Sequence, residues 1–192
     1  MSDIRVVVAE DEAIIRMDLV EVLREEGYDV VAHTGRGDDA VALVIEHRPD
    51  LALLDVKMPG MTGIEAAREI TSSADTAVVM LTAFSQRELI HEASDAGAMA
   101  YLVKPYQRED LVPAVELAIA RRREAAALRS ELDAAEQRFE ERKTIDRAKG
   151  KLIDEHSLSE GDAFTFLQRS AMSSRRRMID VAHEVLAGDA TP

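Results

Sequence analysis

Three carboxylate residues stand where two short apolar runs end. Glu10 and Asp11 follow the run that begins at Ile4, and Asp55 follows residues 51–54. If the two runs are neighbouring parallel strands, their carboxyl ends bring the three side chains together. Packed like charges raise one another's pKa and favour a cation between them. A few carboxylates with water form the all-oxygen site that Mg²⁺ prefers, so we expect a magnesium site rather than an ordinary helix cap.

Two further residues end later runs of the same kind. Thr82 follows the run that begins at Ala77, and Lys104 follows the run that begins at Met99. A hydroxyl and an ammonium on this rim could hold phosphoryl oxygens around Asp55. Phosphoryl transfer needs mainly positioning and charge neutralisation, and this set supplies both. Either residue alone would be an ordinary surface side chain, but together at successive strand ends they indicate phosphoryl chemistry.

These residues depend on an alternation of short apolar runs and helical patterns over the first 110 residues. We expect strands at residues 4–9, 28–32, 51–54, 77–81 and 99–103. Short β-branched runs fit strands that are buried on both faces, as in a parallel sheet. Two helices should begin at capping boxes, Thr62 with Glu65 and Ser85 with Glu88. The predicted fold class is α/β, with a doubly wound five-stranded parallel sheet.

The charge is concentrated in the same N-terminal part. Residues 1–110 contain 10 basic and 22 acidic residues, or −12, whereas residues 140–192 contain 9 and 10, or −1. The first part would repel nucleic acid and the last would not. The chain of 192 residues therefore divides into an acidic domain and a different C-terminal module.

Composition excludes several classes of protein. There is no cysteine, which rules out disulfides and thiol catalysis and is compatible with a reducing compartment. The N-terminus lacks the pattern of a signal peptide, and no apolar run reaches the roughly 20 residues that span a bilayer. We therefore expect a cytoplasmic protein with no membrane partner.

After Gln107 the pattern stays helical for about forty residues, which predicts one long helix. Its apolar stripe either forms a two-helix coiled coil, as in a homodimer, or packs back on its own domain. Arg121 and Arg142 interrupt the second heptad series. The uninterrupted series consists of Leu111, Ala118, Ala125, Leu132 and Phe139.

The residues that follow predict a small all-α three-helix bundle, which includes the end of the long helix. Ser159 with Asp162 should start its second helix, and Ser173 or Ser174 should start its third. Phe164 is expected on the buried face of the second helix. The predicted divisions are an α/β domain at 1–118, a helical linker at 119–141, the bundle at 142–187 and a tail at 188–192.

Residues 3–118 resemble a receiver domain of two-component signalling. The flavodoxin-like fold of that family has strand order 2-1-3-4-5. Receiver domains are phosphoacceptor signalling proteins rather than turnover enzymes, although they can catalyse their own phosphorylation and dephosphorylation. The matching stretches are Val8-Ala9-Glu10-Asp11-Glu12, Leu54-Asp55-Val56-Lys57-Met58-Pro59-Gly60, Leu81-Thr82-Ala83 and Val103-Lys104-Pro105.

The receiver resemblance implies a role for each matching residue. Asp55 would be phosphorylated by a sensor histidine kinase, and a cis peptide bond would precede Pro105. Tyr101 would be the aromatic residue that changes rotamer on activation, or else an ordinary half-buried tyrosine. Glu10 stands where aspartate is commoner, which leaves its water-mediated role intact. The implied Mg²⁺ ligands are Asp11, Asp55, the backbone carbonyl of Lys57 and, through water, Glu10, while Thr82 is the implied switch hydroxyl and Lys104 the phosphoryl clamp.

Residues 138–187 resemble an ANTAR domain, an RNA-binding antitermination module. The resemblance rests on Arg147-Ala148-Lys149-Gly150-Lys151-Leu152 and on the small and apolar residues of the two following helices. It implies binding to RNA hairpins in nascent transcripts. Gln168 departs from the arginine that is usual at its position. Phe164 and Phe166 could stack on bases, although Phe164 is expected in the core. The candidate RNA-binding residues are Arg147, Lys149, Lys151, Arg169, Arg175, Arg176 and Arg177, the last three expected at the first turn of the last helix.

Three alternatives remain open on the sequence. The basic residues could be a solvated surface without a ligand. The output module could bind DNA, although a DNA reader would need a recognition helix and usually a more basic domain. The acidic pocket could belong to a metal-dependent hydrolase, which would need a general acid or base near Asp55.

Overall fold

The computed structural model describes residues 4–83 and 87–192 of the chain. It separates into two compact units, Met1–Ala126 and Ala127–Pro192. None of the described helices is both long and apolar enough to cross a membrane.

The first unit is built on a five-stranded parallel sheet of order β2-β1-β3-β4-β5, as predicted. Its central strands are buried on both faces: every residue from Val6 to Ala9 and from Leu51 to Leu54 has no exposed surface. This explains the continuous apolar runs in the sequence. The strands are β1 (Arg5–Ala9), β2 (Asp29–Thr34), β3 (Leu51–Asp55), β4 (Ala77–Thr82) and β5 (Ala100–Val103).

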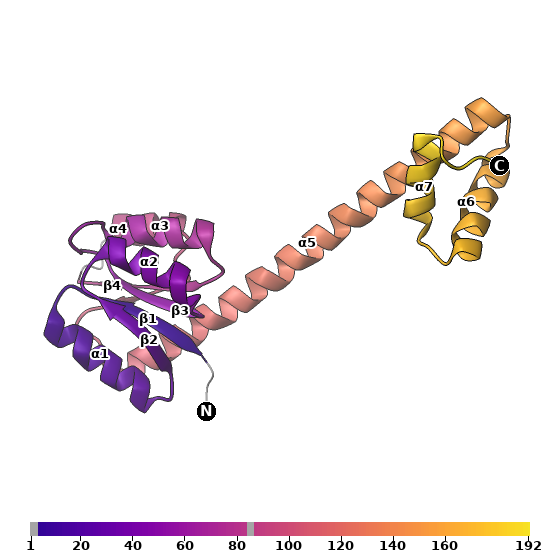
Figure 1. Cartoon of the computed structure of the whole chain (residues 1–192). Helices are drawn as coiled ribbons and strands as arrows, with labels where there is room; N and C mark the ends of the chain where they lie inside the picture. The colour runs from indigo at the N-terminus through magenta and orange to yellow at the C-terminus, as the bar shows by residue number, and fades with distance from the viewer. Residues whose placement is uncertain (1–3, 84–86) are drawn as a thin grey trace. The chain divides into compact units, whose positions relative to one another are not determined.

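Helices cover both faces of the sheet (Figure 1). Val6 and Val8 of β1 pack toward α1 (Ala13–Glu25) and the start of α5 (Arg108–His156). Val7 and Ala9 point to the other face, which is covered by the remaining helices. Alternate residues of one strand thus serve two cores. The helices on the second face are α2 (Gly37–His47), α3 (Gly63–Ser73) and α4 (Arg87–Asp95).

Local signals set the start of α3 as the sequence predicts. The Thr62 hydroxyl accepts a hydrogen bond from the Glu65 backbone, and the Glu65 carboxylate accepts one from the Thr62 backbone, which completes the capping box. The other expected box includes Ser85, which lies outside the described residues. Helix α4 begins at Arg87.

The first part of α5 packs on its own domain, where Leu111 and Ala118 are buried. Arg121, which interrupts the second heptad series, donates from its side chain to the carbonyl of Met99, the residue before β5, at 2.5 Å. Arg122 bridges Asp50 and Asp75 at 2.8 and 3.1 Å, at the end of the sheet opposite Asp55. The sequence left two alternatives for the apolar stripe of this helix, a coiled coil or packing on its own domain. The second alternative therefore applies to the first part of α5.

The second unit contains the C-terminal part of α5, with α6 (Glu160–Ser174) and α7 (Met178–Ala187). The Ser159 hydroxyl caps α6 by accepting from the Asp162 backbone, as predicted. The three helices share one core, which consists of Ala148, Leu152, Ala163, Leu167, Ala171, Val181, Ala182 and Val185.

The predicted start of the last helix is wrong. Ser173 and Ser174 end α6 instead, because their hydroxyls bond back to the Ser170 carbonyl rather than capping a new helix. Arg175 then takes a left-handed conformation with φ of 54°, and α7 begins at Met178. The three arginines 175–177 therefore form the link between α6 and α7 rather than the first turn of α7.

The prediction that Phe164 is a core residue is also wrong. Its side chain is 43% exposed, whereas Phe166 is partly buried against the core. Ala163, Leu167 and Ala171 fill the buried face of α6, and Phe164 falls on the flank beside them.

Candidate functional site

The carboxyl ends of β1 and β3 bring the three predicted carboxylates together. Glu10 and Asp11 follow β1, Asp55 is the last residue of β3, and these strands are hydrogen-bonded neighbours. Glu10 is fully buried, Asp55 is 7% exposed and Asp11 is exposed. One oxygen of each carboxylate lies within 4.8 Å of the others.

Lys104 enters this cluster from the end of β5. Its Nζ lies 2.5 Å from Glu10 Oε2 and 3.2 Å from Asp55 Oδ2. The peptide bond between Lys104 and Pro105 is cis, as the resemblance to receiver domains implies. One ammonium thus faces three carboxylates, which leaves the cluster with an excess of negative charge.

Burial raises the pKa of Asp55, although the charge of Lys104 opposes the rise. Burial likewise raises the pKa of Glu10 against the hydrogen bond from Lys104. For Lys104 burial alone would lower the pKa, but the hydrogen bond to Glu10 and the charge of Asp55 outweigh it and raise the pKa. The site therefore favours a charged lysine and disfavours fully ionised carboxylates.

The cluster fits Mg²⁺ in ligand type and spacing. Octahedral Mg²⁺ with bonds of 2.0–2.1 Å places its ligand oxygens about 3 to 4 Å apart. Three carboxylate oxygens within 4.8 Å of one another come close to that range. Lys57, whose backbone carbonyl was predicted as a further ligand, lies in the loop between Asp55 and α3, beside the same rim.

Two glycines fix this loop by close approach of backbone. A Cβ on Gly63 would lie 1.9 Å from the Asp55 carbonyl oxygen, and one on Gly37 would lie 2.0 Å from that of Met61. The Gly37 backbone also donates to the Pro59 carbonyl at 3.2 Å. Only glycine leaves room at these positions, so the starts of α2 and α3 clamp the loop that follows Asp55.

The other predicted residues of the pocket differ in burial. Thr82 ends β4 and is 4% exposed, and its backbone carbonyl accepts from the Lys104 backbone at 2.7 Å. Tyr101 lies on β5 and is 49% exposed. A rim hydroxyl and an exposed aromatic residue on adjacent strands are thus in place on β4 and β5.

Arg16 contacts the same site, although no motif in the sequence points to it. Its Nη1 donates to the Glu10 carbonyl at 2.5 Å and reaches the Asp11 carbonyl at 3.4 Å. The guanidinium therefore holds the backbone that presents two of the carboxylates. A single arginine in a helix carries no motif, so only the fold reveals this contact.

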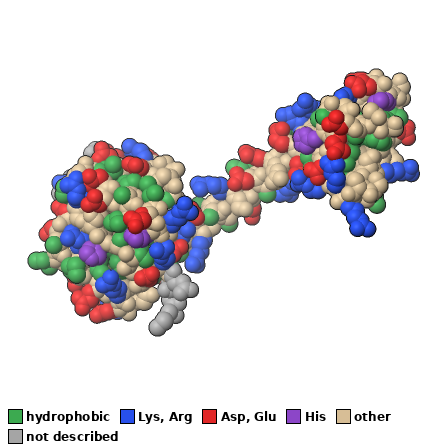
Figure 2. Space-filling model, in the orientation of Figure 1, with side chains coloured by type: hydrophobic (Ala, Val, Ile, Leu, Met, Phe, Trp, Pro, Cys, Tyr) green, Lys and Arg blue, Asp and Glu red, His purple; other side chains and the backbone are tan. Residues whose placement is uncertain are grey.

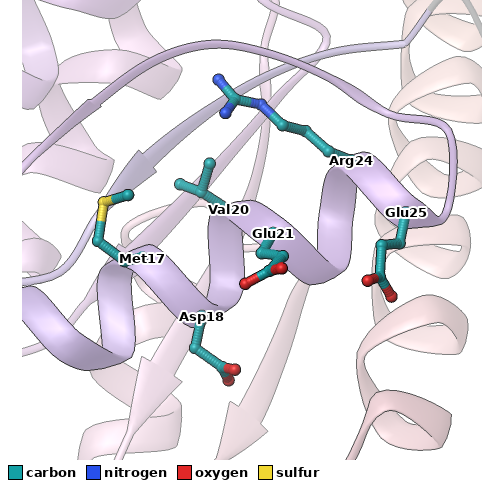
Figure 3. Close-up of a pocket in the computed structure, with 6 residues that line it drawn as sticks. All are labelled: Met17, Asp18, Val20, Glu21, Arg24 and Glu25. Atoms are coloured by element: carbon teal, nitrogen blue, oxygen red, sulfur yellow. The ribbon is translucent and has the colours of Figure 1, made fainter.

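A shallow hollow along α1 does not form a second site. Figure 3 shows its lining side chains on successive turns of this one helix, with Val20 and Arg24 directed away from Asp18, Glu21 and Glu25. Because they diverge, these groups could not converge on one ligand.

The predicted RNA-binding residues fall into two classes. Lys149, Lys151, Arg176 and Arg177 form ion pairs within the second unit. Among the described residues, Arg147, Arg169 and Arg175 have no ion pair or side-chain hydrogen bond. Figure 2 shows this mixture of blue and red side chains on the C-terminal unit. The second class is the one whose charge is available to a ligand.

Comparisons with known proteins match two families to the chain, one in each unit. Residues 6–116 match the response regulator receiver domain family, and residues 133–186 match the ANTAR domain family. The transcriptional regulatory protein PdtaR of Mycobacterium tuberculosis is 54% identical over 188 residues, which cover 98% of this chain and 92% of that protein.

Two further relatives match the first unit. The chemotaxis protein CheY of Bacillus subtilis is 36% identical over 112 residues, which cover 58% of this chain and 93% of that protein. The crystal structure of the response regulator domain of Thermotoga maritima CheB superposes with a TM-score of 0.59 at 29% identity, covering 62% of this chain and 98% of that structure.

Proposed function

Because this chain belongs to the response regulators and joins a receiver domain to an ANTAR domain, we propose that phosphorylation of Asp55 by a sensor histidine kinase gates RNA binding. The RNA would be hairpins in nascent transcripts, and the outcome would be transcription antitermination in the cytoplasm. The proposed phosphorylation of Asp55 is supported by the convergence of four side chains at one edge of the sheet, those of Glu10, Asp11, Asp55 and Lys104.

In the proposed step a carboxylate oxygen of Asp55 attacks the phosphorus of a phosphohistidine. A P–O bond forms, the P–N bond breaks, and the imidazole of the kinase keeps the electron pair. Lys104 favours the charged, nucleophilic form of Asp55, since the ammonium lies 3.2 Å away and opposes the rise in pKa that burial causes. Bound Mg²⁺ would neutralise part of the negative charge on the phosphoryl oxygens. Asp11, Asp55 and the Lys57 carbonyl would hold it directly, and Glu10 through water.

The phosphoryl group would then act through its charge of about −1.5 to −2. Lys104 lies near enough to Asp55 to contact a phosphoryl oxygen, and the Thr82 hydroxyl would bond to another. Tyr101 would move toward the space left beside Thr82, which changes the surface of β4 and β5. The residues that respond are thus adjacent along the carboxyl edge of the sheet.

We also propose that α5 pairs with a second copy over the linker 119–141. Leu128, Leu132 and Phe139 are 61%, 58% and 66% exposed, at spacings that keep them on one stripe of the helix. Sedimentation of the phosphorylated chain should show a dimer, and substitution of all three by glutamine should abolish it. A monomer at all concentrations would argue against this pairing.

The phosphorylation claim is tested by incubating the full chain with Mg²⁺ and either a phosphorylated kinase or a small-molecule phosphodonor. Intact-mass measurement should show a single added phosphoryl group that is lost in Asp55→Asn. The matched control Asp29→Asn changes an exposed aspartate of the same unit and should behave as wild type. Modification of Asp55→Asn, or steady release of phosphate over many turnovers from an ester, would contradict the proposal.

A further inference from the structure

Helix α6 exposes a stripe of large side chains that its packing does not require. Phe164, Gln168 and Met172 are spaced four residues apart, so they lie along one face of the helix. Phe164 is 43% exposed and Met172 is 73% exposed. We call these three residues the α6 stripe. By the rise of an α-helix it is about 12 Å long.

The charge beside the α6 stripe and at its C-terminal end is positive, whereas Glu160 and Asp162 lie in the first turn of the helix. The segment 163–177 contains four arginines and no acidic residue, in a chain whose net charge is −13. Two of the four are paired with carboxylates: Arg176 with Glu184 and Arg177 with Asp180. Arg169, on the flank of the stripe, and Arg175, at its end, have no side-chain partner in the described parts of the chain. The free positive charge therefore lies beside the exposed aromatic and thioether side chains.

This combination distinguishes the α6 stripe from an ordinary surface. Single exposed apolar residues are common and need no ligand. Here an aromatic ring, an amide and a thioether share one face of α6, with the unpaired guanidinium of Arg169 on its flank and that of Arg175 at its C-terminal end. A contact with a second copy of the chain would need a broader apolar patch, and the stripe offers only two apolar side chains. The exposed leucines of α5 suit that purpose better.

We propose that the α6 stripe binds the unpaired bases of an RNA loop. Phe164 stacks on a base, Gln168 donates to and accepts from a base edge, and Met172 packs against a neighbouring base. Arg169 and Arg175 contact the phosphates on either side. Single-stranded loops present splayed bases in this way, and aromatic and arginine side chains are their usual partners. The inference rests on the proposed RNA-binding function and assigns its reading surface.

The first test uses a pool of RNA hairpins with one common stem and a randomised loop, bound to the full phosphorylated chain. Phe164→Leu keeps the apolar contacts with the bundle and removes the stacking surface. It should weaken binding to the selected hairpin roughly 5- to 150-fold, the range of one lost base–aromatic stack. Phe164→Tyr should bind as wild type, because the ring is retained.

The second test exploits the left-handed backbone of Arg175. Glycine is favoured at such a helix end, so Arg175→Gly should raise the melting temperature while it weakens RNA binding. It should also reduce the slope of log K against log salt by about 0.7, the value for one phosphate contact on a single strand. Arg48 ends α2 with the same left-handed geometry, at φ of 45°. Arg48→Gly is therefore the matched control, and it should raise the melting temperature without changing RNA affinity.

The outcomes separate this inference from the function on which it rests. If the wild-type chain binds no hairpin of the pool, both are overturned. If wild-type binding is tight but Phe164→Leu and Arg175→Gly bind equally well, only the assignment to the α6 stripe is overturned. If the α6 stripe instead contacts a second copy of the chain, the two variants should change the oligomeric state seen by sedimentation and leave RNA affinity unchanged. That result also overturns the assignment.

Discussion

Lys104 lies between two buried carboxylates, and this single ammonium sets the electrostatics of the pocket. It contacts Glu10 and Asp55 from the end of β5, while Asp11 adds a third negative charge. Burial raises the pKa of both buried carboxyl groups, so their ionised forms are stabilised less in the folded chain than in the unfolded one. At neutral pH without a cation, the pocket therefore costs stability.

Asp55→Asn should consequently stabilise the metal-free chain, by on the order of 1 kcal/mol, because it removes one of the crowded charges. Saturating Mg²⁺ should make the wild type more stable than the variant. At a hundred times its Kd, Mg²⁺ would stabilise the wild type by about 2.7 kcal/mol and the variant by much less. Chemical denaturation with and without Mg²⁺ measures both effects. The exposed Asp29→Asn serves as the control, and an equal response of all three chains to Mg²⁺ would refute this account.

Gly150 is a position in α5 where a substitution should stabilise the helix. It lies in the interior of α5, and a Cβ added there would meet no atom within 4 Å. Gly150→Ala should therefore raise the free energy of unfolding by about 0.5–1 kcal/mol, the usual gain in a helix interior. Thermal denaturation would show it. A loss of stability would mean that this face of α5 is covered by something that the single chain does not show.

At the scale of elements, α5 is held to the receiver unit by its arginines as well as by its apolar face. Arg122 bridges Asp50 and Asp75, and the backbone of Arg5 also donates to Asp50. Burial would raise the pKa of Asp50, but these partners outweigh it and lower the pKa below its ordinary value of 3.8. This contact holds α5 at the end of the sheet opposite the carboxylate cluster of Glu10, Asp11 and Asp55.

Arg122→Met should reduce the free energy of unfolding of the receiver unit by about 1 kcal/mol at neutral pH. Because the folded pKa of Asp50 is lowered, the stabilisation exists above the ordinary pKa and disappears as the pH falls through the folded value. The difference between variant and wild type should therefore shrink in acid. Arg123→Met is the matched control, since Arg123 is exposed. A difference that grows toward low pH would contradict the assignment to Asp50.

The sequence was sufficient for the strands and for the residues at their ends, because buried parallel strands leave continuous apolar runs and end at the functional edge. It was insufficient where the same residues are compatible with two local structures. Ser173 and Ser174 have the side chains of a helix start, yet their hydroxyls bond backward and extend α6. Phe164 follows the apolar pattern, but the small Ala163 and Ala171 already complete the buried face. The contact of Arg16 with the Glu10 carbonyl depends on the fold alone.

For the whole molecule, the proposed function requires that one charge change at Asp55, in the first unit, controls the helical module of the second unit. Moving a two-state population from 1:99 to 99:1 requires about 5.5 kcal/mol of differential stabilisation. A phosphoryl group held by one lysine and one hydroxyl supplies part of this. We expect pairing through α5 and binding of RNA to supply the rest. The net charge of −13 opposes nucleic acid in general, so productive binding depends on the C-terminal module, where residues 140–192 carry a net charge of only −1.

Gating of RNA binding by Asp55 is tested most directly by the affinity of the full chain for a selected hairpin RNA, measured at one salt concentration with and without a phosphodonor and Mg²⁺. We expect the phosphodonor to tighten binding by the wild type and to have no effect on Asp55→Asn, and we expect duplex DNA of equal length to bind more weakly than the hairpin. Equal affinity of the wild type with and without the phosphodonor, or tighter binding to the duplex DNA, would contradict it.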